Sequence, residues 1–405
     1  MGLELETIGD GSDLVWQRFE VPYEFPVVFC DNVLDPTSTT LLDAMSYREP
    51  DSCHKCLLFV DAGLLENGSS DLLDQIATFC AAHPNRIDMV AHPIAVPSGE
   101  AIKTGPEHLE KIQNDIHKYR IDRHSYVIAI GGGAVLDAVG YASAIAHRGV
   151  RHIRLPTTVL AQNDSGVGVK NAINLHGVKN YSGTFAPPWA VINDYQFIRS
   201  LPTRDRIAGL AEAVKVAMIR DGAFFDWMET HTGDLTRFEE SAERYVIRRC
   251  AELHMRQIGQ GGDPFERGSA RPLDFGHWAA HKLESITRNT LRHGEAVAIG
   301  IALDTRYSVL TGLLDADQAD RVMTLLEGLG FSLYHPDLFA EGPDGRSRLI
   351  AGLEEFREHL GGELTITLIS RLGIDVEVHE IDDALMLQAL HWLKDSFGPL
   401  PHAAE

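Results

Sequence analysis

The first half of the chain alternates short apolar runs with amphipathic stretches, and this alternation limits the possible folds more than any other feature. Apolar runs at residues 26–30, 56–61 and 126–130 have the length of buried strands, and residues 72–83 and 109–120 have helical periodicity. Strands that alternate with helices predict a parallel sheet covered by helices. Such sheets bind dinucleotides at the carboxyl ends of their strands, so we expect an α/β nucleotide-binding domain.

Beyond about residue 200 the pattern changes to long helical stretches, such as residues 204–220 and 243–258. We therefore expect a mostly helical C-terminal domain. A chain of 405 residues is longer than one hydrophobic core usually supports, so we divide it into two domains, residues 1–198 and 199–405. The cleft between two such domains is the first place to look for an active site.

Charge and hydropathy exclude several classes of partner. The chain has 36 Lys and Arg residues against 58 Asp and Glu residues, a formal net charge of −22, which repels nucleic acid and anionic membrane surfaces. No segment approaches the roughly 20 apolar residues of a membrane span, and the acidic start does not resemble a signal peptide. The five cysteines, an odd number spread along the chain, do not suggest a disulfide framework. We expect a cytoplasmic protein with no nucleic-acid or membrane partner.

Three consecutive glycines, Gly131 to Gly133, stand between an apolar run and a predicted helix that contains Asp137. Glycines at this position let the backbone approach a pyrophosphate at the helix N-terminus, although a tight structural turn would use the same residues. Polar residues before and after the loop indicate a binding surface. They are Glu100, Lys103, Thr157, Thr158, Asp164, Lys170, Lys179 and Asn180.

Residues 273–284, LDFGHWAAHKLE, place His277 and His281 four positions apart and Glu284 three positions further on. If the segment is a helix, both imidazoles lie on one face. A metal site and a pair of core or surface histidines would both produce this spacing. The stretch alone leaves the two interpretations open.

A series of motifs occurs in a fixed order between about residues 60 and 310. They are GGGAVLDAVG at 131–140, HRG at 147–149, LPTTVLAQNDSGVGVKNAIN at 155–174, GVKN at 177–180, AGLAEAVK at 208–215, FGH at 275–277 and RHGEAVAIG at 292–300. In this order they resemble the sugar phosphate cyclases, the superfamily of 3-dehydroquinate synthase. The resemblance implies a dehydroquinate synthase-like fold, with a Rossmann-like NAD-binding α/β N-terminal domain and a mostly α-helical, metal-binding C-terminal domain, in a homodimer.

The resemblance implies one zinc, or cobalt, held by Glu212, His277 and His293. Three protein ligands leave an open coordination position, which a catalytic zinc requires. His281 falls where the family contacts the substrate phosphate. The two histidines of residues 273–284 would therefore divide between metal and anion.

The resemblance also implies a tightly bound NAD and a sugar phosphate substrate. A ring hydroxyl next to the metal is transiently oxidised, phosphate is eliminated, the hydride returns, and ring opening with an intramolecular aldol reaction closes a carbocycle. The implied NAD contacts are Asp61, Glu100, Lys103, Gly132, Gly133, Asp137, Thr157, Thr158, Asp164 and Lys179. The implied substrate contacts are Arg148, Asp164, Lys170, Asn180, Lys215, Arg256, Asp274, His281 and His359. The implied catalytic residues are Lys215, Glu266, His281 and Asp274.

The chain departs from 3-dehydroquinate synthase where that enzyme binds a substrate carboxylate. Ala270 and Asp274 stand where it has arginine and asparagine, and Arg271 would be turned by about 100 degrees on a helix. Losing a bidentate partner and gaining a negative charge both disfavour a carboxylate. His359 is our candidate for a histidine that sedoheptulose 7-phosphate cyclases carry near a lost lysine, although a solvated helix end would also account for it.

We therefore expect turnover of sedoheptulose 7-phosphate to 2-epi-valiolone or 2-epi-5-epi-valiolone. One alternative is a 3-dehydroquinate synthase with a rearranged carboxylate site. A second is a metal-dependent alcohol dehydrogenase, which has no use for the phosphate contacts Arg148, Lys170, Asn180 and His281. A third is an inactive relative that serves in binding or assembly, against which the intact metal set and Lys215 argue.

Overall fold

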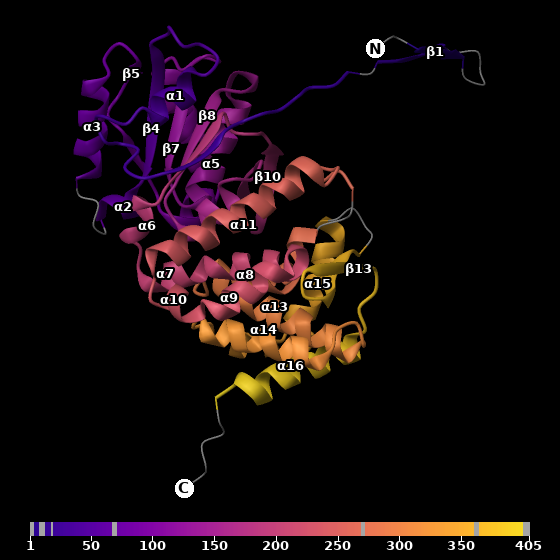
Figure 1. Cartoon of the computed structure of the whole chain (residues 1–405). Coiled ribbons are helices and arrows are strands. Elements are labelled where there is room, and N and C mark those ends of the chain that lie inside the picture. Colours follow the sequence, from indigo (N-terminus) through magenta and orange to yellow (C-terminus); the bar gives the residue numbers. More distant parts are fainter. Residues whose placement is uncertain are drawn as a thin grey trace.

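The computed structural model describes residues 4–7, 13–17, 19–66, 71–268, 272–359 and 364–399. Its N-terminal half contains a seven-stranded sheet in the order β3-β11-β8-β7-β4-β5, with β6 also pairing to β4 (Figure 1). The strands are β3 (Val27–Cys30), β4 (His54–Asp61), β5 (Ile87–Met89), β6 (Ile94–Val96), β7 (Tyr126–Gly131), β8 (Arg151–Pro156) and β11 (Ala190–Asp194). Every neighbouring pair is parallel, which confirms the predicted sheet.

Alternate side chains of the central strands pack on opposite faces of this sheet. In β4, Leu57 and Phe59 enter one apolar core, while Leu58 and Val60 enter another. Helices cover both faces: α1 (Thr40–Ser46) and α3 (Leu72–Ala82) on one, α4 (Glu107–Lys118) and α5 (Gly133–Ile145) on the other. Strands that are buried on both faces are continuous apolar runs, and this is why β4 and β7 could be recognised in the sequence.

Beside β4 the chain changes the direction in which it adds strands to the sheet. Such a switch point marks a ligand site. β5 and β6 pair on one side of β4, and β7 pairs on the other. Parallel sheets bind ligands outside the carboxyl ends of the strands at such a switch point. Asp61 ends β4 and Gly131 ends β7, so both lie where a dinucleotide is expected.

An antiparallel hairpin, β9 (Lys170–Leu175) and β10 (Val178–Phe185), belongs to the N-terminal half but lies outside the main sheet. β9 packs against α5. The sequence indicated only a polar binding surface at these residues, and the hairpin itself was not predicted.

Helices dominate the C-terminal half, which confirms the second predicted architecture. They are α6 (Gln196–Arg199), α7 (Thr203–Ala208), α8 (Leu210–Arg220), α9 (Gly222–Thr230), α10 (Thr232–Thr236), α11 (Glu240–Gln260), α12 (His277–Ile286), α13 (His293–Leu310), α14 (Ala316–Gly328), α15 (Arg348–His359) and α16 (Asp383–Phe397), with a small hairpin of β12 (Ile366–Arg371) and β13 (Ile374–Val378). α8 and α13 are buried along most of their length. A helix that is apolar on all sides belongs in the centre of a domain, and the other helices surround these two (Figure 1).

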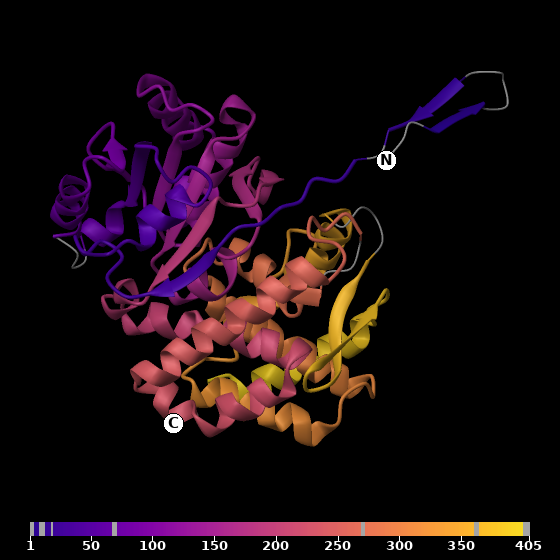
Figure 2. The ribbon, with the colours of Figure 1, turned by 45° about the horizontal axis from the view of Figure 1, so that its top comes forward.

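The N-terminal strands β1 (Glu4–Thr7) and β2 (Asp13–Trp16) pair with each other and lie away from the body of the molecule in both views (Figures 1 and 2). Within the described ranges we find no helix with the length and apolar character needed to cross a membrane.

Candidate active site

Three helices of the C-terminal half contribute the candidate metal ligands. Glu212 lies in α8, His277 begins α12, and His293 begins α13. α12 and α13 approach closely, because a Cβ atom on Gly300 would lie only 2.0 Å from the Gly276 carbonyl oxygen. Gly276 directly precedes His277 and has a φ of 75°, a left-handed conformation that favours glycine. These glycines allow the two helices to bring their histidines together.

We expect Gly300→Ala to destabilise the protein by about 1–3 kcal/mol, because the new methyl group would overlap backbone atoms. Gly259→Ala is a matched control in α11, since no atom lies within 4 Å of a Cβ there. Alanine should stabilise that helix by roughly 0.5–1 kcal/mol. Denaturant unfolding of both variants measures the difference. A Gly300→Ala protein as stable as the wild type would show that the two helices do not depend on this contact.

The donor atoms of the three candidate ligands all lie within 4.8 Å of one another. Glu212 Oε1 is 3.4 Å from His277 Nε2 and 3.3 Å from His293 Nε2. The other ring nitrogens are already engaged: His277 Nδ1 is 3.1 Å from the Phe275 carbonyl oxygen and His293 Nδ1 is 3.2 Å from Glu284 Oε2. Both Nε2 atoms therefore face the Glu212 carboxylate. Two imidazoles and one carboxylate in this arrangement fit a catalytic zinc.

The surroundings of Glu212 also fit a metal ligand. The side chain is fully buried, and its Oε1 has no hydrogen-bond partner among the described residues. Burial alone would raise the pKa of this carboxyl, but Lys215 and His277 outweigh burial and hold it well below its usual range. Lys215 Nζ forms an ion pair with Oε2. Oε1 is left facing the histidines, where a cation would satisfy it.

Lys215 connects the metal set to the N-terminal half. Burial would lower the pKa of Lys215, but Glu212 and Asp164 raise it above its ordinary value. Asp164 lies in a π-helical turn, residues 161–165, and its Oδ1 is 2.6 Å from His254 Nδ1. His254 lies in α11 and was missed by the sequence analysis. Its sequence position carries no signal, because only the packing of α11 on this turn brings it to Asp164.

Three of the implied site residues, Lys170, Glu266 and Asp274, form a second charged group. Lys170 Nζ is 2.6 Å from Glu266 Oε1. Partial loss of hydration opposes the change, but Asp274 and Glu266 raise the pKa of Lys170, and Asp274 also raises the pKa of Lys215. The sequence predicted that the negative charge of Asp274 disfavours a substrate carboxylate, and the structure adds that two lysines interact electrostatically with Asp274. The repulsion between Asp274 and a substrate carboxylate is therefore weaker than expected.

Two arginines of the implied set lie apart from this group. Arg148 and Arg256 are both exposed, and within the described part of the chain the hydrogen bonds and ion pairs do not join either of them to the other site residues. Ala270 and Arg271 lie outside the described residues, and so does the side chain of His359, the last residue of α15.

The glycine loop has the geometry of a pyrophosphate site. Gly132 is the N-cap residue of α5, and no described side chain caps this helix end. A Cβ on Gly132 would lie 3.3 Å from Thr158 Cγ2, and one on Gly133 would lie 2.5 Å from Ser165 Oγ. A side chain at either position would crowd these neighbours, and the free N–H groups of a helix N-terminus suit an anion.

Lys103 connects several of the implied NAD contacts. Its Nζ donates to Asp137 Oδ2 at 2.7 Å and to Asn180 Oδ1 at 2.5 Å. Lys103 is buried, so these contacts fix its position. Asn180, which the resemblance assigned to the phosphate, therefore contacts a residue of the implied NAD set in this structure.

Two further NAD contacts support the same region. The Thr157 backbone N–H donates to the Gly131 carbonyl oxygen at 3.0 Å, which fixes the end of β8 against the glycine loop. Glu100 Oε2 accepts from Asn174 Nδ2 at 3.1 Å, and its Oε1 is 3.9 Å from Lys179 Nζ. Glu100 and the hairpin are thereby joined.

The N-terminal and C-terminal models of 3-dehydroquinate synthase match consecutive parts of the chain, residues 93–208 and 209–342. The 3-dehydroquinate synthase of Bordetella pertussis is 37% identical over 281 residues, which cover 69% of this chain and 76% of that protein. The chain belongs to the 3-dehydroquinate synthase family. It is thus a member of the sugar phosphate cyclase superfamily.

Two relatives of this cyclase are named for a different product. The 2-epi-5-epi-valiolone synthase of Streptomyces glaucescens is 38% identical over 242 residues, 60% of this chain and 62% of that protein. A solved structure of the 2-epi-5-epi-valiolone synthase of Streptomyces hygroscopicus subsp. jinggangensis, with NAD⁺ and Zn²⁺ bound, is similar with a TM-score of 0.81 at 27% identity. It covers 94% of this chain and 99% of its own. Identity alone does not separate the two substrates within the family.

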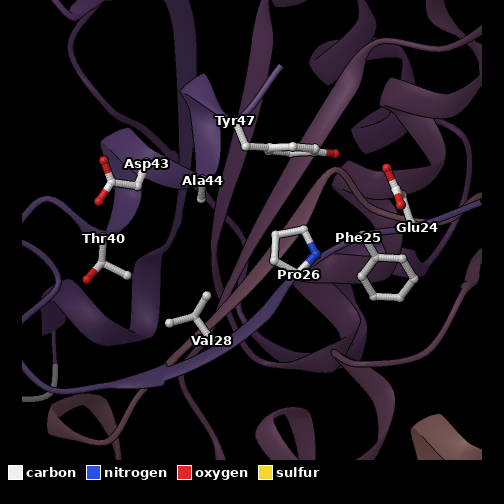
Figure 3. A pocket seen from close by; sticks show the side chains of 8 residues that line it. All are labelled: Glu24, Phe25, Pro26, Val28, Thr40, Asp43, Ala44 and Tyr47. Carbon is white, nitrogen blue, oxygen red and sulfur yellow. The ribbon is translucent and has the colours of Figure 1, made fainter. Parts of the chain in front are cut away.

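A separate cavity of about 650 Å³ lies beside α1 and β3 (Figure 3). Its lining residues are Glu24, Phe25, Pro26, Val28, Thr40, Asp43, Ala44 and Tyr47. The lining includes two carboxylates and no cation, and it shares no residue with the sites above. A phosphorylated sugar would be repelled there, so we place the chemistry at the metal set.

Proposed function

We propose that this cyclase converts sedoheptulose 7-phosphate to 2-epi-valiolone or 2-epi-5-epi-valiolone and releases phosphate, as an NAD- and metal-dependent lyase. The observation that carries the choice of substrate is Asp274, which stands where the dehydroquinate enzyme has asparagine and lies within electrostatic reach of Lys170 and Lys215. A carboxylate accepts hydrogen bonds from hydroxyls, so it suits a polyhydroxylated substrate. The similarity to two valiolone synthases supports the same choice.

When bound, NAD and the metal would supply reversible hydride transfer at a ring hydroxyl made more acidic by the metal. Glu212, His277 and His293 would hold that metal, and the glycine loop with Lys103 and Asp137 would hold the dinucleotide. Lys215 is buried beside Glu212 and stays protonated. A buried cation of this kind stabilises negative charge that develops on a substrate oxygen.

Lys170 has a different task, which is to hold the phosphate until it leaves. The Lys170 side chain is 56% exposed, so its ammonium group can meet an anion that enters from solvent. Glu266 Oε1 forms an ion pair with this ammonium group. The resemblance also assigns His281 to the phosphate. Its ring lies beside those of His277 and His293, and burial together with Lys179 holds its pKa well below the usual range. A neutral His281 contacts phosphate as a hydrogen-bond donor.

The test is to offer purified protein, with NAD and zinc, either sedoheptulose 7-phosphate or the carboxylated C7 substrate of 3-dehydroquinate synthase. We expect phosphate release and a cyclic product, identified by NMR, from the first and no turnover of the second. Asp274→Asn should weaken the first reaction without rescuing the second, because asparagine restores the residue type of the dehydroquinate enzyme but not its missing arginine. Efficient formation of dehydroquinate would overturn the proposed substrate.

The same assay separates a cyclase from an alcohol dehydrogenase. A cyclase returns the hydride in each turnover, so absorbance from NADH should not rise in proportion to product. One NADH for each substrate consumed would indicate net oxidation. In that case the residues around Lys170 that we assign to phosphate binding would have no part in the chemistry.

A further inference from the structure

We infer that Glu284 is a positioning residue for the metal: its carboxylate fixes the ring of His293, and Lys179 anchors that carboxylate to the N-terminal half. The inference rests on the proposed metal dependence. It adds to the three ligands Glu284, the last residue of the stretch 273–284, to which the sequence assigned no role.

The geometry places the ring of His293 between two buried carboxylates. On one side, Nε2 is 3.3 Å from Glu212 Oε1, and on the other, Nδ1 is 3.2 Å from Glu284 Oε2. A neutral imidazole donates from one nitrogen and offers a lone pair from the other. A hydrogen bond from Nδ1 to Glu284 selects the form whose Nε2 lone pair points to the metal position. Carboxylates commonly orient metal-binding histidines in this way.

Glu284 is itself held in place. Its side chain is 4% exposed, and its Oε1 accepts from Lys179 Nζ at 2.6 Å. Each of its two oxygens therefore has its own partner, Lys179 for one and His293 for the other. Such a carboxylate cannot rotate without losing a hydrogen bond in a buried place. The ring of His293 inherits this fixed orientation.

One possible ligand atom from each of His281, Glu284 and His293 also lies within 4.8 Å of the others, so these three residues could hold an ion between them. We favour the positioning role for two reasons. Both oxygens of Glu284 already have partners, Lys179 and His293, whereas Glu212 Oε1 is buried without a hydrogen-bond partner among the described residues. A metal bound to Glu284 would leave that buried carboxylate unsatisfied.

Lys179 links the orientation of the His293 ring to the N-terminal half of the molecule. It lies in β10 of the hairpin that belongs to the N-terminal half, while Glu284 lies in α12 of the C-terminal half. The orientation of a metal ligand therefore depends on where the hairpin sits. Lys179→Met should weaken metal binding although Lys179 contacts none of the three ligands.

The experiment titrates zinc into the metal-free full-length protein in competition with a chromophoric chelator. We expect Glu284→Gln to weaken zinc affinity about 10- to 100-fold while one equivalent still binds at saturation. Lys179→Met should weaken it in the same direction. The double variant should be weaker than wild type by less than the product of the two single effects, because both changes act through one contact. Glu355→Gln is the control, since this exposed residue of α15 pairs with Lys282 of α12 and not with a metal ligand.

Each outcome decides one point. Unchanged affinity in Glu284→Gln, with normal thermal unfolding of the metal-free protein, would overturn the positioning role. Complete loss of zinc at saturation would also overturn it, by showing that Glu284 is a ligand. If Glu284→Gln does not fold, Lys179→Met gives the same test from a partly exposed position. Wild-type protein that binds no zinc would refute the metal dependence itself, which is a separate failure.

Discussion

Turnover should stop when the metal is removed, and His277→Ala and His293→Ala should each lose the metal. Each histidine supplies one of only three candidate ligands, and both Nε2 atoms face the same oxygen of Glu212. Two ligands cannot replace the geometry of three around an open position. We expect activity to fall by at least about 1000-fold, which corresponds to roughly 4 kcal/mol of lost transition-state stabilisation.

The measurement combines elemental analysis with a phosphate-release assay after exhaustive chelation and after zinc is returned. His391→Ala is a control for loss of a histidine, because His391 is exposed on α16 and contacts Phe339 instead of the metal set. It should keep both metal and activity. Full metal occupancy in either ligand variant would show that the ligands are misassigned, and activity that survives complete removal of zinc and cobalt would contradict the mechanism.

The parallel sheet could be predicted from the sequence because its strands are buried on both faces and therefore consist of consecutive apolar residues. It did not predict the β9–β10 hairpin, where polar residues and glycines conceal the alternation of a strand. It also predicted a single helix over residues 204–220, whereas the structure has two that are separated at Gly209. A Cβ on Gly209 would lie 2.5 Å from Val159 Cβ. This packing against a distant segment is not visible in local periodicity.

Some residues of the candidate site could likewise be predicted from the sequence, and others could not. Glu212, His277 and His293 are recognisable because each lies in a motif of its own. Glu284 and His254 are not, because their partners are far away in the sequence and are found only when helices pack together. The same reason explains why the lysines around Asp274 were not predicted. Its neutralising lysines come from β9 and α8, and their proximity depends on how the two halves meet.

Lys215→Met should be the most damaging single change outside the metal ligands. We expect kcat to fall at least about 100-fold, the effect of removing a group that stabilises negative charge on the reacting oxygen. We also expect metal-free protein to lose about 3–5 kcal/mol of stability, since breaking a buried ion pair leaves an uncompensated charge. Lys215 is 3% exposed and its partner Glu212 is 0% exposed. Lys282→Met is the control, because its partner Glu355 is largely exposed and such pairs contribute at most about 1 kcal/mol.

The two effects of Lys215→Met can be separated by adding zinc. A bound zinc places positive charge against the same carboxylate, so it should restore much of the lost stability while kcat stays low. Unfolding followed with and without zinc, beside steady-state kinetics at saturating NAD, measures both. If zinc restored activity as well as stability, the ammonium group would serve only to neutralise Glu212. Wild-type kcat in the variant would remove Lys215 from the chemistry. The expected result, a stable zinc-loaded protein that turns over poorly, requires that the ammonium group itself meets the reacting oxygen.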